Sequence, residues 1–146
     1  MPGAIAGIAT LVTVANGGTG TATPQWSVQT FSFAAAPVDT VRARAIYPFD
    51  SGQVRAIYVA ALGTAPTAGT LAVQRGIGAG GATMLPSATV ALNLLAANTV
   101  AGADNSASPG LTATTANLQG DVGDGITIEV VNVNQDIVVM IAIGPQ

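Results

Sequence analysis

The sequence has no cysteine, no histidine and no lysine. The absence of cysteine excludes disulfide bonds and thiolate metal sites, although it leaves the cellular compartment open. Without histidine or lysine, a serine or threonine nucleophile lacks the usual general bases. A serine paired with a carboxylate would still be conceivable, but no spacing in the sequence supports one. We therefore expect that the protein is not an enzyme.

Charge is also scarce. Charged residues make up 8% of the chain, compared with about 25% in a typical soluble protein. The mean hydropathy is +0.54. A small monomer normally needs a charged surface to stay soluble, so we expect other subunits to cover part of this one, most simply in a homotrimer. The net charge of −3 argues against nucleic acid and against anionic membranes as partners.

The N-terminus, MPGAIAGIATLVTVA, is apolar and uncharged. It has no Lys or Arg before the apolar run, so it does not resemble a signal peptide. As a helix it would span about 22 Å, which is less than the roughly 30 Å of a bilayer core. We expect residues 1–20 to be an arm and glycine-rich hinge, and residues 21–146 to be one domain. The arm would contact a partner through its larger apolar side chains, Ile5, Ile8, Leu11, Val12 and Val14.

The rest of the chain reads as short apolar-polar alternations separated by Gly, Pro, Asn and Asp. About eight or nine such segments at this spacing are typical of a sandwich or barrel. We predict an all-β fold, a jelly-roll-like antiparallel β-sandwich with an N-terminal arm. Residues 34–36 and 94–97 are alanine-rich and could form helical turns. The clearest predicted strands are residues 26–33, 41–47, 54–62, 70–75, 126–133 and 137–143, with a weaker one at 111–118.

The stretch RGIGAGGA contains glycines at the spacing G-x-G-x-x-G, which is a dinucleotide-binding fingerprint when it joins a strand to a helix. A strand is predicted before Gly76. The residues after Gly81 include Pro86 and β-branched side chains, where that helix would have to begin. Asp104, at a suitable distance for a ribose contact, lies in a polar loop rather than at a strand end. The stretch is therefore predicted to be a hairpin loop, and we expect no nucleotide or other cofactor.

Two aspartates, Asp121 and Asp124, lie close together in the stretch QGDVGDGITIEVV. Together with loop carbonyls they could begin a calcium shell, because calcium takes six to eight oxygen ligands. Their spacing does not match an EF-hand loop. Asp-Gly and Gly-Asp pairs are also ordinary turn sequences before a strand. The turn is the stronger interpretation, and calcium remains an alternative.

Three of the four arginines fall on two neighbouring predicted strands: Arg42, Arg44 and Arg55. If Tyr47 faces Val54 across the intervening turn, the three side chains project from one face of a hairpin. Such a face could contact an acidic partner surface. Alternatively, the arginines form a solvated face with Asp39 or Asp50, since surface ion pairs of this kind are common and weak.

Two runs, DSGQVRAIYVAALGTAPTAGTLAV (50–73) and LQGDVGDGITIEV (118–130), resemble small β-sandwich proteins of tailed-phage virions. They are most similar to head decoration, or cement, proteins. That resemblance implies a jelly roll that sits as a trimer on the outer capsid surface, binds the major capsid protein and stabilises the shell. Head-fibre, tail-fibre and receptor-binding domains share these turn patterns and are alternatives.

A carbohydrate-binding module is an alternative from a different class. It would need exposed aromatic side chains to stack on sugars. The chain offers few: Trp26, two tyrosines and three phenylalanines. This scarcity favours the structural role.

Overall fold

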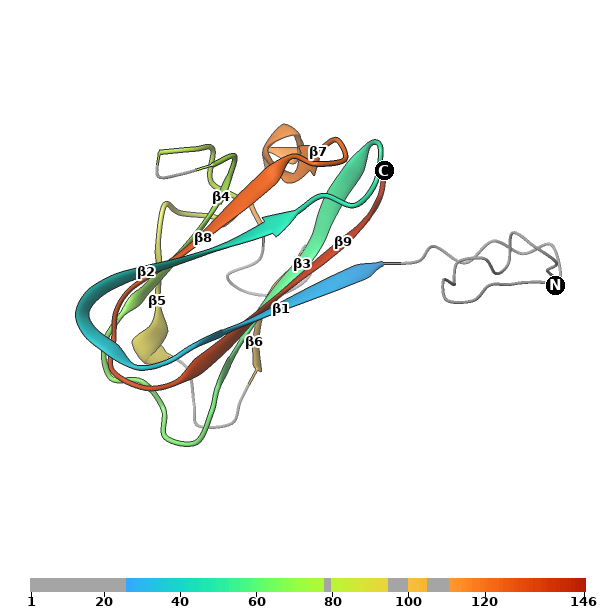
Figure 1. Ribbon diagram of the computed structural model, residues 1–146. Helices are drawn as coiled ribbons and strands as arrows, with labels where there is room; N and C mark the ends of the chain where they lie inside the picture. Colours follow the sequence, from blue (N-terminus) through green and yellow to red (C-terminus); the bar gives the residue numbers. More distant parts are fainter. Residues whose placement is uncertain (1–25, 78–79, 95–99, 105–110) are drawn as a thin grey trace, which may run out of the picture.

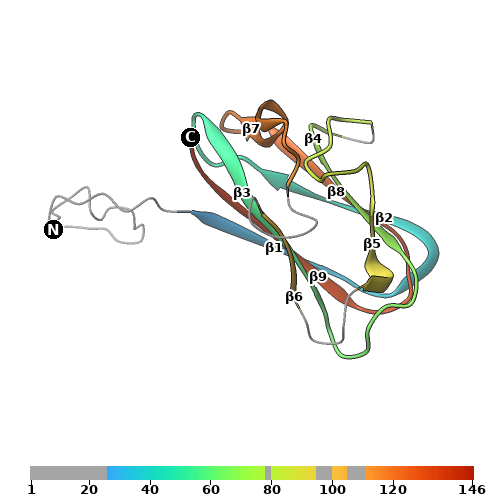
Figure 2. The ribbon, with the colours of Figure 1, turned by 180° about the vertical axis from the view of Figure 1, so that it is seen from behind.

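The computed structural model describes residues 26–77, 80–94, 100–104 and 111–146. Two antiparallel sheets pack face to face (Figures 1 and 2). We name each sheet after a central strand. The β9 sheet has the order β1 (Ser27–Phe33), β9 (Ile137–Pro145), β3 (Gly52–Ala61) and β6 (Val100–Asp104), and the short β7 (Gln119–Gly120) also pairs with β3. The β8 sheet has the order β2 (Ala36–Ile46), β8 (Gly125–Val133), β4 (Thr70–Arg75) and β5 (Val90–Ala91).

The strand pairings identify the fold as a jelly roll. Leaving out β7, the first described strand pairs with the last, β1 with β9, and the pairing continues inward as β2 with β8, β3 with β6 and β4 with β5. All four pairs are antiparallel, as in one long hairpin that has been rolled up. The pairs β3–β9 and β4–β8 then join these hairpins into two sheets. This nesting is the eight-stranded jelly-roll topology, so the predicted fold class is confirmed.

The core lies between the two sheets and is built from alternate residues of their central strands. In β8, Ile126, Ile128 and Val130 are fully buried, as the alternation in the sequence predicts. In β9, the inward positions from Ile137 to Ile143 are buried as well. The other face of β9 is only partly covered, because Val138 and Met140 are half-buried.

Three predictions about the elements are wrong. Asp104 does not lie in a polar loop, because it is the last residue of β6. Residues 34–36 do not form a helical turn, because Ala36 already begins β2. Residues 111–118 do not form a strand. Instead, a 3-10 turn at Thr115–Leu118 places Leu118 in the core. A second 3-10 turn, Leu92–Leu94, overlaps the start of the predicted turn at 94–97, and the remainder of that prediction lies outside the described residues.

The predicted arm, residues 1–20 with Ile5, Ile8, Leu11, Val12 and Val14, also lies outside the described residues. The part of the chain that the structure describes contains no helix that is both long and apolar enough to span a membrane.

Candidate functional site

The structure separates the three arginines that were predicted to share a hairpin face. Arg42 and Arg44 lie on β2 in the β8 sheet, whereas Arg55 lies on β3 in the β9 sheet. The turn after Tyr47 carries the chain from one sheet to the other, so β2 and β3 are not hydrogen-bonded neighbours. The predicted hairpin is wrong. Arg55 instead donates a hydrogen bond to the carbonyl of Pro145.

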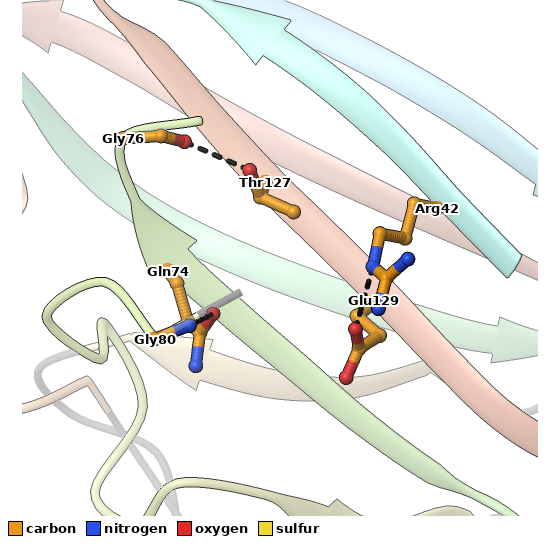
Figure 3. A network of polar contacts seen from close by, with 6 residues as sticks. All are labelled: Arg42, Gln74, Gly76, Gly80, Thr127 and Glu129. Carbon is orange, nitrogen blue, oxygen red and sulfur yellow. Dashed lines mark hydrogen bonds and ion pairs between the residues drawn. The ribbon is translucent and has the colours of Figure 1, made fainter. Parts of the chain in front are cut away.

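Arg42 and Arg44 point outward from the β8 sheet. Arg42 lies opposite Glu129 in the β2–β8 ladder, and its Nε is 2.7 Å from Glu129 Oε2 (Figure 3). Arg42 therefore forms its ion pair with Glu129 and not with the predicted partners Asp39 or Asp50. Arg44 lies opposite Thr127, and the described residues provide it with no ion pair.

The glycine-rich stretch is a loop that folds over the outer face of the β8 sheet. It leaves β4 at Arg75 and returns at Ala82, where Arg75 N donates to Ala82 O at 2.9 Å. Gly76 has a φ of +99°, which favours glycine. Its N–H donates to Gly125 O, and its C=O accepts from Thr127 Oγ1 at 2.8 Å (Figure 3).

Two further contacts close this loop. Gly80 N donates to the Gln74 side chain at 3.1 Å (Figure 3). Gln74 also forms an isolated antiparallel bridge with Thr83. The hairpin-loop prediction is confirmed, because the strand is not followed by a helix where the dinucleotide fingerprint needs one.

The loop borders two shallow hollows. The larger, of about 530 Å³, lies between the loop and the Asp121–Gly125 turn, and Arg75, Ile77 and Asp124 are among its lining residues. The smaller, of about 240 Å³, lies between Ile77 and the outward arginines, over Thr127. Ile77 itself is 72% exposed. Ile46, on the same side of β2 as the two arginines, is 49% exposed. The outer face of the β8 sheet therefore combines cations with exposed apolar side chains.

The two aspartates form a turn. Asp121 N donates to Asp124 Oδ2 at 3.0 Å, and Asp124 N donates to Asp121 O at 2.9 Å. The other carboxylate is also engaged, because Ser51 N donates to Asp121 Oδ1. Both carboxylates therefore stabilise the turn by accepting hydrogen bonds from backbone N–H groups. No group of three or more His, Cys, Asp or Glu that could hold a metal ion occurs among the described residues, and calcium remains a prediction.

Tyr47 fixes this turn to the core. Its side chain is fully buried, and its hydroxyl donates to Leu118 O at 2.6 Å. Tyr47 N and O also bond to the backbone of Asp124 and Gly123. Burial raises the pKa of the Tyr47 phenol well above its ordinary value, and the nearby Arg75 opposes that rise only partly. The phenol therefore acts as a neutral hydrogen-bond donor.

The outer face formed by β1, β9 and β3 carries very little charge. Met140 lies between Tyr58 of β3 and Thr30 of β1, and Val28 of β1 lies opposite Ala142. Thr30 and Ser32 are exposed polar residues on the same side of β1 as Val28. Val28 is 58% exposed, and Trp26, whose ring lies over Gly144, is 52% exposed. Among the described positions of these three strands, Arg55 is the one charged side chain near this face, and it is turned toward Pro145.

The sequence predicts this face only in part: the continuous apolar run 137–143 is typical of a strand with one face toward the core and the other toward a partner subunit, but it does not place Val28 or Tyr58 beside that strand. The predicted strands 26–33 and 137–143 each carry apolar residues on both faces. Such strands imply that the face turned away from the core carries little charge, although Thr30 and Ser32 of 26–33 are polar. Comparisons of the chain with protein families, with curated proteins and with solved structures found no match.

Proposed function

We propose that the protein is a virion structural protein, a capsid decoration protein that binds the outer surface of the shell and stabilises it. The observation that carries the proposal is the nearly uncharged outer face formed by β1, β9 and β3, with Val28, Met140 and Tyr58 on these three neighbouring strands. Exposed apolar patches on soluble proteins mark interaction surfaces. The jelly roll adds support, because viral capsid domains use this fold among others.

The proposed partner is the major capsid protein, and the proposed assembly is a homotrimer. Many modest contacts, repeated over a lattice, would resist expansion of the shell through multivalency. The N-terminal segment with Ile5, Ile8, Leu11, Val12 and Val14 would add uncharged apolar contacts. Light scattering at micromolar concentration tests the assembly, because a monomer mass would contradict the trimer.

The test of the docking face uses two matched substitutions. Val28 and Val122 are both 58% exposed, but Val122 lies in the Asp121–Asp124 turn between β7 and β8 and not on β1, β9 or β3. Undecorated shells of the parent virus are mixed with each variant and then sedimented. Val28→Glu should lower the affinity for shells by about tenfold or more, because a carboxylate would be buried without a partner. Val122→Glu should bind normally. Equal binding by both variants would contradict the proposed face.

A carbohydrate-binding module is a second candidate, favoured by one observation. Trp26 lies over Gly144, and Tyr58 lies opposite Met140. These two positions on β9 are four residues apart, or about 13 Å along a strand. Two aromatic rings on one flat face are a suitable platform for sugar rings. Affinity electrophoresis in soluble polysaccharides tests this function, which requires retardation of the native protein and its loss in Trp26→Ala.

A further inference from the structure

The strand β2 forms one edge of the β8 sheet. It pairs with β8 along one side, and no described strand pairs with its other side. In such a strand, the N–H and C=O groups of every second residue point away from the sheet. Ile46 has this orientation, because its N–H and C=O both bond to the Gln29 side chain, at 3.1 and 2.7 Å.

Three further residues have the same orientation as Ile46 by alternation: Thr40, Arg42 and Arg44. Their backbone donors and acceptors therefore lie along the open edge. The Gln29 side chain covers only the Ile46 end of it. Exposed edges of this kind are templates for pairing with another chain.

The edge is accessible to a ligand. Residues 37–42 are all exposed. Val41 points inward, toward the space between the sheets, and yet it is 36% exposed. Ala43, the next inward residue, is only half-buried. Phe31 of β1, the neighbouring edge strand of the other sheet, is also only partly buried against the core. The sandwich is thus incompletely closed along β2, and an apolar seam reaches the surface.

The outward face of the same edge is cationic. Arg42 is paired with Glu129, but Arg44 has no ion pair among the described residues. The hollow of about 240 Å³ is lined by both arginines and by Ile77. These charges also oppose pairing of β2 with β2 of a second copy, because arginines would then lie across from arginines.

We infer that the free edge of β2 binds an extended segment of a partner protein in which apolar and acidic side chains alternate. The segment would add as a strand and form hydrogen bonds with Thr40, Arg42 and Arg44. Its apolar side chains would cover Val41 and Ala43. Its acidic side chains would face Arg44 on the outer side of the sheet. Such binding does not depend on whether the partner is a capsid shell.

Peptide titration of the full ¹⁵N-labelled chain tests the inference. The probe is a short peptide that alternates valine and glutamate. We expect amide shifts at residues 40–46 at millimolar peptide. A valine–lysine peptide should bind about tenfold more weakly or worse, because its charges repel Arg44. The valine–glutamate peptide with every second amide N-methylated should lose binding, because methylation removes the strand hydrogen bonds.

Two charge reversals complete the experiment. Arg44→Glu should lower the affinity for the valine–glutamate peptide by about tenfold and raise the affinity for the valine–lysine peptide. Arg75→Glu makes the same change of charge at the end of β4 and should leave both affinities within about twofold, since it does not touch the β2 edge. The dispersion of the amide spectrum checks that each variant is folded, and the peptide series on the native protein does not require either variant.

Four results would overturn the inference. One is an absence of shifts at residues 40–46. Another is equal binding by the glutamate and lysine peptides, and a third is retained binding by the N-methylated peptide. The fourth is a shift of the β2 amides when the protein alone is concentrated, because a second copy would then occupy the edge.

Discussion

Replacing Tyr47 with phenylalanine removes one hydroxyl from the point where the Asp121–Asp124 turn meets the core. The ring can stay in place, because it is fully buried and rests against two glycines. A Cβ on Gly120 would lie 2.6 Å from Tyr47 Cε2, and one on Gly52 would lie 2.9 Å from Tyr47 Cδ1. The substitution therefore isolates the bond from the hydroxyl to Leu118 O.

The expected cost follows from that bond. The Leu118 carbonyl would lose its 2.6 Å donor inside the protein. Leaving a buried acceptor without a partner costs about 1–3 kcal/mol. For a domain of this size, 1 kcal/mol corresponds to a shift in Tm of roughly 4 °C. We expect Tyr47→Phe to melt about 4–12 °C below the native protein.

The difference in stability between the native protein and Tyr47→Phe should shrink at high pH. Burial raises the pKa of Tyr47 in the folded state, whereas in the unfolded chain it ionises near its ordinary value of about 10. Above that pH the unfolded state therefore binds fewer protons than the folded state. The native protein then loses stability at about 1.4 kcal/mol per pH unit. Tyr47→Phe lacks this loss, so the two free energies of unfolding should converge above pH 10.

Thermal unfolding followed by circular dichroism measures the shift in Tm, and urea unfolding at a series of pH values measures the two free energies of unfolding. Tyr58→Phe is the control, since it removes the same hydroxyl from a half-buried position on the outer face of the β9 sheet, where water can replace a lost partner. Tyr58→Phe should lose less stability than Tyr47→Phe. A Tyr47→Phe variant as stable as the native protein at pH 7, or a constant difference from pH 9 to beyond pH 10, would refute the reasoning.

Three other substitutions test the packing and the surface. Gly120→Ala should cost about 2 kcal/mol or more by urea unfolding, because its methyl group would collide with the Tyr47 ring, and an unchanged midpoint would contradict this contact. Val38→Asn should raise stability by about 1 kcal/mol, because Val38 has a φ of +61° and is 90% exposed; a lower midpoint would argue against strain there. Arg42→Ala should cost less than about 1 kcal/mol, and less still in high salt, because the ion pair with Glu129 is at the surface. A loss that does not depend on salt would point to packing instead.

The central strands could be predicted from the sequence because their patterns are local. β4 has the predicted bounds, Thr70–Arg75. β8 and β9 extend their predictions by one or two residues. In each case alternate apolar residues face a single core, so the pattern and the burial coincide. The glycine-rich loop was also predictable, since Pro86 lies where the nucleotide-binding fold needs a helix.

The pairing of strands was not predictable in the same way. The sequence PFDSG after Tyr47 has the composition of a hairpin turn, but β2 and β3 belong to different sheets. Inward residues of both strands face the same core in either arrangement, so the alternation cannot distinguish them. The start of β2 was missed for a local reason. Pro37 and Asp39 interrupt the strand pattern there, and the ladder accommodates them with a register shift between Ala36 and Thr40.

The candidate surfaces depend on this non-local pairing. Val28 lies beside Ala142, and Tyr58 lies beside Met140, only because β9 runs between β1 and β3. The open edge of β2 follows from its place at the end of the β8 sheet. The residues of both surfaces are visible in the sequence, but their grouping requires the sheet order.

Electron microscopy of undecorated shells mixed with the native protein tests the central proposal most directly. The proposed function predicts added density on the outer surface of the shell at regular lattice positions, with the outer face of the β9 sheet, and Val28 within it, turned toward the capsid protein. Bare shells at saturating protein would contradict the decoration role. Density attached through the β8 sheet, with Val28 facing solvent, would contradict the proposed docking face.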